Sequence, residues 1–128
     1  MDTLFNRKWE ARKTQLVESL LKLNPHLNIK VAHAYMEHMN KLKNLEYNIF
    51  KLALDILEKS CRASGKPSQN LYILRLYNVC LLVAQKYLLD NPYNNSTWAR
   101  YSPFQLNINR LNKFEVDLLE TINWAIVA

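Results

Sequence analysis

The chain has 128 residues, of which 49% are hydrophobic and 22% are charged. This length and composition are typical of one globular domain with a single core. One Gly and four Pro argue against hairpins and against Gly-rich loops that bind phosphate. The net charge of +6 comes from 17 Lys and Arg that are spread along the chain without a basic block, so nucleic-acid binding is not expected.

The first helix is predicted from an apolar stripe that starts close to the N-terminus. Asp2 is its expected N-cap, and Asn24-Pro25 ends it, because the residue before a proline disfavours helical geometry. Arg12, Lys13 and Glu18 are expected to face water. The stripe itself comprises Phe5, Trp9, Leu16, Leu20 and Leu23.

Two more helices are predicted before the middle of the chain. One spans about 28–42, and its apolar residues are Ile29, Ala32, Met36 and Met39, with Val31, Tyr35 and Leu42 close to them. The next spans about 46–64 and stops at Gly65, with Pro67 just beyond, which is the usual punctuation of a helix C-terminus. Its apolar residues are Ile49, Phe50, Ala53, Leu54, Leu57 and Cys61.

A central helix is predicted over about 70–89, starting after Ser68 or Asn70 and ending near Leu89. Residues 79–84 leave it no polar face, so it belongs at the centre of a helical bundle. After a loop at 90–96, the run Ser-Pro-Phe-Gln at 102–105 predicts the start of a short helix, with a capping Ser and a Pro at the first helical position.

The last helix is expected to begin at Asn109 or Asn112. Its apolar stripe comprises Leu111, Phe114, Leu118, Leu119 and Ile122, and the aromatic residues Trp98 and Trp124 are expected in the core. These elements together predict an all-α fold.

Two cysteines and the absence of a long apolar run indicate the compartment. Cys61 and Cys80 fall on separate predicted helices without a CxxC pair, which favours core thiols in a reducing environment. No stretch approaches the length of a membrane span, and the N-terminus lacks the apolar run of a signal peptide. We therefore expect an intracellular protein that does not bind membranes.

No catalytic or metal centre is expected. The spacing of His33, Glu37 and His38 does not fit the zinc-peptidase pattern, in which two His on one helix face bind the metal. No Ser/His/Asp, Cys/His or paired-carboxylate pattern of useful spacing is present. The sequence thus predicts neither an enzyme nor a cofactor.

Three segments of the second half carry a family resemblance. Residues 82–87 read Leu-Val-Ala-Gln-Lys-Tyr, residues 90–98 contain a Tyr-Asn turn followed by Trp98, and the last helix carries Asn112 and Glu115 before it closes in Asn-Trp-Ala-Ile at 123–126. These segments resemble the second half of a cyclin box, most closely that of the fungal cyclins that partner the phosphate-responsive cyclin-dependent kinase, of the PHO85 class. Gln85 stands where the family has a small residue.

Upstream the resemblance is weaker. Residues 53–59 are similar to the second helix of the box, where Glu58-Lys59 would stand for an Asp-Arg pair. A Met-Arg pair that opens the first helix of many cyclins has no counterpart near Ile29-Lys30. The resemblance implies a single five-helix cyclin box at 26–128, preceded by an additional N-terminal helix at 1–25.

The resemblance also implies a function. A cyclin binds and positions a cyclin-dependent kinase, and Lys86 and Glu115 would be polar anchors around the mobile αC helix of that kinase. Glu58, Tyr87 and Leu119 complete the expected kinase-binding residues, and we expect no homo-oligomer. The alternative is a cyclin-fold adaptor or scaffold for a non-kinase protein partner.

Taken without the resemblance, each anchor has a simpler interpretation. Lys86 could be a solvated residue that favours the C-terminal end of a helix dipole. Glu115 could be an acid that caps the N-terminus of a helix starting near Asn112. Tyr93 and the Asn residues around it could simply close the loop.

Overall fold

A computed structural model describes residues 3–64, 73–104 and 106–127, with side chains from residue 7 onward. The described residues form six α-helices and no strand, which confirms the all-α prediction. The helices are α1 (Thr3–Leu23), α2 (Ile29–Asn40), α3 (Tyr47–Ser64), α4 (Ile73–Leu88), α5 (Asn95–Tyr101) and α6 (Ile108–Thr121). The expected positions Asp2, Gly65, Pro67, Ser68 and Asn70 lie outside the described residues.

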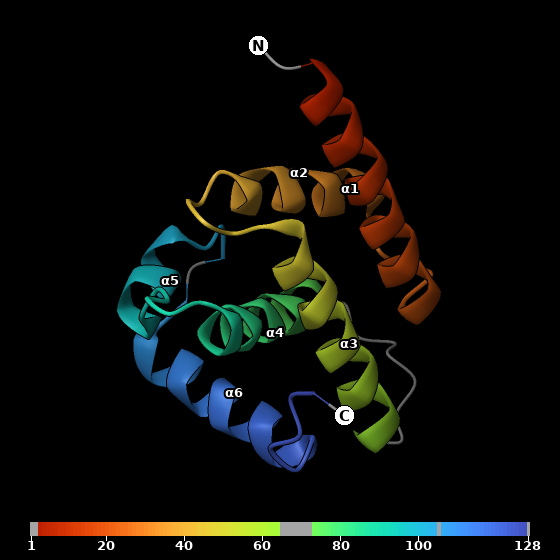
Figure 1. The fold of residues 1–128 in the computed structure, drawn as a ribbon. Helices are drawn as coiled ribbons and strands as arrows, with labels where there is room; N and C mark the ends of the chain where they lie inside the picture. Colours follow the sequence, from red (N-terminus) through yellow and green to blue (C-terminus); the bar gives the residue numbers. More distant parts are fainter. Residues whose placement is uncertain (1–2, 65–72, 105, 128) are drawn as a thin grey trace.

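Helix α4 is the centre of the bundle (Figure 1). Its residues from Tyr77 to Gln85 are all buried, as the continuous apolar run predicts. α3 packs along α4, and α6 packs on α4 from another side. α2 makes a polar contact with α4 through Tyr35, whose hydroxyl donates to Asn78 Oδ1 at 2.7 Å.

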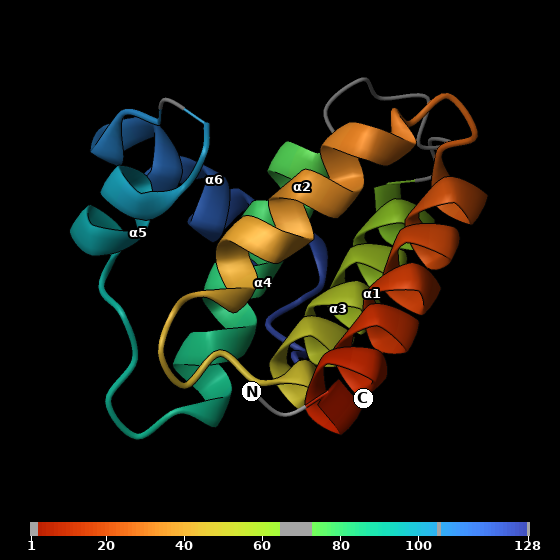
Figure 2. The same cartoon turned by 90° about the horizontal axis from the view of Figure 1, so that it is seen from above.

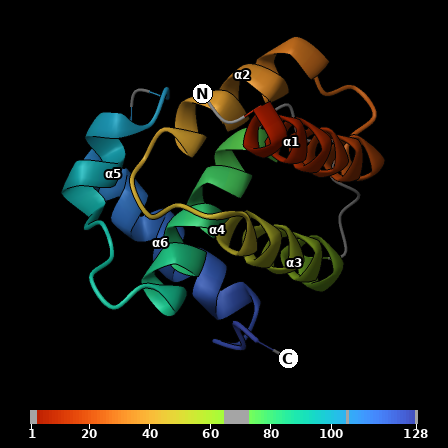
Figure 3. The same ribbon diagram turned by 45° about the horizontal axis from the view of Figure 1, so that its top comes forward.

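The outer layer is made by α1 and α5. α1 lies beside α3 and against α2 (Figure 2), while α5 packs on α6 at the opposite side of the molecule (Figure 3). Asn side chains cap three helices: Asn28 accepts from the Val31 N–H, Asn94 from the Thr97 N–H and Asn107 from the Asn109 N–H. These caps explain why α2, α5 and α6 begin where they do.

The short helix predicted at 102–105 is placed wrongly, and the loop expected at 90–96 is correspondingly shorter. α5 begins at Asn95 and ends before Ser102, whose N–H and Oγ both donate to the Trp98 carbonyl oxygen, at 2.9 and 2.7 Å. Ser102 therefore closes a helix instead of opening one. The last helix begins at Ile108, one residue before the earlier of the two predicted starts.

Several predicted side-chain environments are also wrong. Lys13 is buried because it lies between the carboxylates of Glu10 and Glu37. Ile29 and Val31 are exposed in the first turn of α2, and Phe114 is exposed because it lies on a flank of α6 and not on the side that faces the core. Trp98 is buried as expected.

Trp124 is 60% exposed, which contradicts its expected place in the core. Asn123 and Trp124 both adopt left-handed backbone angles, with φ of 54° and 61°. The Trp124 N–H donates to the Leu119 carbonyl oxygen at 2.7 Å, so the chain reverses direction directly after α6. Lys59 Nζ on α3 then binds the carbonyl oxygen of Ala125 at 2.8 Å, which holds the reversed segment against α3.

Candidate functional site

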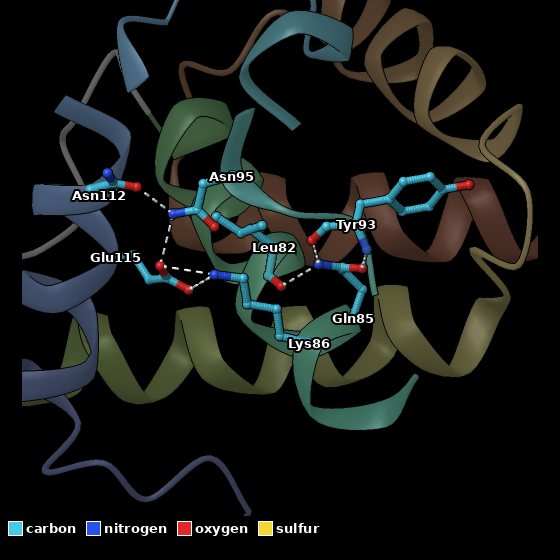
Figure 4. Close-up of polar contacts among 7 residues, drawn as sticks. All are labelled: Leu82, Gln85, Lys86, Tyr93, Asn95, Asn112 and Glu115. Atoms are coloured by element: carbon cyan, nitrogen blue, oxygen red, sulfur yellow. Dashed lines mark hydrogen bonds and ion pairs between the residues drawn. The ribbon is translucent and has the colours of Figure 1, made fainter. Parts of the chain in front are cut away.

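Lys86 and Glu115 form an ion pair that joins the end of α4 to the middle of α6 (Figure 4). Lys86 Nζ lies 2.8 Å from Glu115 Oε2 and 3.1 Å from Oε1. The Lys86 side chain is 35% exposed and that of Glu115 is 14% exposed. Both residues are the anchors that the resemblance implies, and the fold brings them together although 29 positions separate them.

Asn95, the first residue of α5, adds a third helix to this contact. Its Nδ2 donates to Glu115 Oε1 at 2.9 Å and to Asn112 Oδ1 at 2.6 Å. The Glu115 carboxylate thus accepts from Lys86 and from Asn95, and its orientation is held from two sides. We call Lys86, Asn95, Asn112 and Glu115 the Lys86–Glu115 cluster (Figure 4).

Gln85 fixes the loop that leads from α4 into this cluster. The side chain is fully buried, and its Oε1 accepts from the Tyr93 N–H at 2.8 Å. Its Nε2 donates to the carbonyl oxygens of Leu82 at 3.1 Å and Tyr93 at 2.9 Å. The amide therefore forms hydrogen bonds with both backbone groups of Tyr93, two residues before α5 begins (Figure 4).

Apolar side chains flank the cluster on both helices. Tyr87 follows Lys86 and is exposed, and Val116 follows Glu115 and is 44% exposed. Leu119 lies one turn after Glu115 on the same flank of α6 and packs against the core. We call Lys86, Tyr87, Glu115, Val116 and Leu119 the α4–α6 face.

Glu58 is not part of this face. It lies on α3 in a shallow depression with Asp55, Lys59 and Arg62, beside Ile126 and Val127 near the C-terminus. No hydrogen bond or ion pair links Glu58 to the Lys86–Glu115 cluster among the described residues. A role for Glu58 in partner binding stays a prediction.

Neither cysteine is an activated nucleophile in the structure. Burial raises the pKa of the Cys80 thiol well above its ordinary value, and burial also raises that of Cys61, so neither is activated as a thiolate. No group of three or more His, Cys, Asp or Glu in the described part of the chain could hold a metal ion. No helix there is long and apolar enough to cross a membrane.

The composition of the α4–α6 face suits protein recognition. It has a partly desolvated ion pair with exposed apolar groups around it, which is the common composition of a binding surface. Lys86 has three donor hydrogens and one carboxylate partner, so donor capacity remains for a backbone carbonyl of another protein.

Comparison with known proteins identifies the family. Residues 5–127 match the family model of the cyclin N-terminal domain. The chain therefore belongs to the cyclin family, and its six helices have the cyclin fold.

Over 62 residues the chain is 34% identical to PHO85 cyclin-1 of Saccharomyces cerevisiae. This match covers 48% of the chain and 21% of that relative. It confirms the resemblance to the fungal cyclins of the PHO85 class. No solved structure matches the chain.

Two residues of the site, Asn95 and Val116, do not follow from the sequence patterns. Asn95 is one of the Asn residues near Tyr93 that local rules assign to a loop, but its position at a helix start is what aims its amide at Glu115. Val116 was overlooked because it lies outside the apolar stripe that faces the core. Its position next to Glu115 and outside the apolar stripe was the available signal, since an apolar residue on the outer side of an amphipathic helix is a candidate contact residue.

Proposed function

We propose that the chain is a regulatory subunit that binds a cyclin-dependent kinase, of the PHO85 class or a related one, through the α4–α6 face. The observation that carries this proposal is the Lys86–Glu115 cluster, in which three helices hold an ion pair among exposed apolar groups. The family match at 5–127 and the likeness to PHO85 cyclin-1 support the same class of partner.

The physical basis is the state of the kinase active site. A protein kinase needs an ion pair between a Lys on its sheet and a Glu on its mobile αC helix. A partner that binds αC holds this pair closed and contributes no catalytic group of its own. The α4–α6 face suits that role, because its polar groups can bind the backbone around αC while Tyr87, Val116 and Leu119 cover apolar area.

The first prediction concerns the charges of the cluster. Replacing both Lys86→Ala and Glu115→Ala should weaken binding of the kinase from the same cell at least about tenfold, because hydrogen-bonded charges in an interface cost about 2–5 kcal/mol when removed. The melting temperature should hardly change, since a partly exposed ion pair contributes about 0–1 kcal/mol to stability. Calorimetric titration with the kinase measures the affinity.

Two further variants make this test specific. The charge swap Lys86→Glu with Glu115→Lys keeps an ion pair within the chain but reverses what it offers a partner, so it should also lose binding. The control Lys113→Ala with Glu120→Ala removes exposed charges from the outer side of α6 and should bind normally. If the swapped chain binds like wild type, the pair only stiffens the face. If the wild-type chain binds no such kinase, the adaptor function replaces this proposal.

A further inference from the structure

A second surface lies on the other flank of α6. An open groove of about 500 Å³ runs between α6 and the first half of α4. Its apolar lining comes from Leu76, Val79, Leu106, Phe114 and Leu118. Phe114 is 45% exposed, so this groove presents an aromatic side chain that is not part of the buried core.

The helical period separates this groove from the α4–α6 face. At 100° per residue, Phe114 and Val116 project from α6 on opposite flanks, with the core-facing Leu111 and Leu118 between them. Glu115 and Leu119 lie on the flank of Val116, whereas Arg110 and Asp117 lie on that of Phe114. The two surfaces can therefore be occupied at the same time.

The rim of the groove carries an excess of positive charge. Arg75 on α4 and Arg110 on α6 line it, against the single carboxylate of Asp117. The Arg75 guanidinium lies 5.7 Å from the centre of the Phe104 ring, and Arg110 forms no ion pair with another described residue. A guanidinium group binds carboxylates well because its planar donors match both carboxylate oxygens.

We propose that this groove binds a short acidic peptide segment of a protein partner. One bulky apolar side chain of the peptide packs on Phe114 above Val79 and Leu118, and a neighbouring carboxylate pairs with Arg110 on the rim. The volume of the groove is within the range of ligand sites, and its open shape suits an extended or helical peptide. Asp117 and the apolar lining disfavour a phosphate backbone, which would need a continuous basic surface.

The test is a selection followed by affinity measurement on the full chain. A random peptide library is selected against the chain, and the most enriched peptide is synthesised and titrated by fluorescence polarisation. We expect an enriched motif that combines Asp or Glu with an aromatic or large aliphatic residue. Phe114→Ala and Arg110→Glu should each weaken binding at least about tenfold, since anchors of this kind carry most of the affinity. Asp117→Asn should strengthen it about two- to threefold by removing the opposing charge.

Matched controls keep the result specific. Val116→Ala removes an equally exposed apolar residue (44% against 45%) from the opposite flank of α6, and Arg100→Glu reverses an exposed charge on α5. Both should bind the peptide as wild type does. The proposal is overturned if the selected peptides are basic, if no peptide is enriched, or if the groove variants bind unchanged.

This inference stands apart from the proposed function. Phe114→Ala should leave kinase binding unchanged, and Val116→Ala should weaken it while peptide binding persists. Loss of one activity without the other therefore shows which of the two proposals fails.

Discussion

At the scale of single residues, Gln85 shows how one buried amide replaces a small residue of the family pattern. A buried polar group is stable only if it is hydrogen-bonded. Here both ends of the amide are satisfied, chiefly by the backbone of Tyr93. The Tyr93 hydroxyl in turn donates a hydrogen bond to the Lys43 carbonyl oxygen at 2.7 Å, so Tyr93 links the α4–α5 loop to the α2–α3 loop.

Removing this amide should destabilise the fold. Gln85→Ala leaves the Tyr93 N–H and carbonyl without their partner, and we expect a loss of about 1–3 kcal/mol in the free energy of unfolding. Chemical denaturation measures it. Gln15→Ala, at an exposed position of α1, is the control and should stay within about 0.5 kcal/mol of wild type. Equal stability of the two variants would show that the hydrogen bonds of the Gln85 amide contribute nothing to the free energy of unfolding.

At the scale of elements, α1 is held to α2 by charge as well as by apolar packing. Lys13 Nζ lies 2.7 Å from Glu37 Oε1 and 3.0 Å from Glu10 Oε2, and Trp9 Nε1 donates to the same Glu37 oxygen at 2.9 Å. The Lys13 hydrogen bond lowers the pKa of Glu37 below its ordinary 4.5 despite some burial. Burial opposes the charge of Lys13, but its bonds to Glu37 and Glu10 raise its pKa above 10.5.

The lowered pKa predicts an acid-sensitive contact between α1 and α2. The unfolded chain binds the Glu37 proton more readily than the folded chain does, so this contribution is present above pH 4.5 and is lost as pH falls through the lower folded pKa. Glu37→Gln removes it. Denaturation between about pH 6 and 3 should show wild-type stability falling more steeply than that of the variant.

A control variant isolates this effect. Glu18→Gln changes an exposed carboxyl on α1 and should keep the wild-type dependence. Parallel curves for wild type and Glu37→Gln would contradict the assignment. The contribution of Lys13 has the opposite sign: it is complete below pH 10.5 and is lost as pH rises through the folded pKa.

The helices themselves were largely predictable from periodicity and caps, but the choice among competing caps was not. Ser102-Pro103 fits a helix start as well as Asn94 does by local rules. The fold selects Asn94 because the helix it begins buries Trp98 in the core. Likewise, the periodicity of α1 predicts that Lys13 faces water. The pattern of one helix gives no information about the carboxylate that α2 brings close to Lys13.

At the scale of the whole molecule, the site depends on how helices cross. Lys86 and Glu115 could be named only through the resemblance to cyclins, since no local pattern links positions 29 residues apart. Their contact follows from the packing of α6 on α4, and Asn95 joins it because α5 packs on α6. The groove beside Phe114 lies between the same two helices, on the other flank of α6 and along the first half of α4.

The three tryptophans lie in three different environments. Trp98 is almost completely buried, Trp9 is half-buried and hydrogen-bonded to Glu37, and Trp124 is held outside the core by the left-handed turn after α6. Its backbone is bonded to Leu119, a residue of the α4–α6 face.

This arrangement makes Trp124 an intrinsic fluorescence probe of the protein. Iodide, which the net charge of +6 attracts, should quench mainly this indole, and Trp124→Phe should abolish most of the quenching. Undiminished quenching in that variant would mean that the turn does not hold the indole in solvent. A kinase that covers the α4–α6 face should protect the emission of Trp124 from iodide, whereas a peptide in the groove should not, so unlabelled protein can report which flank of α6 is occupied.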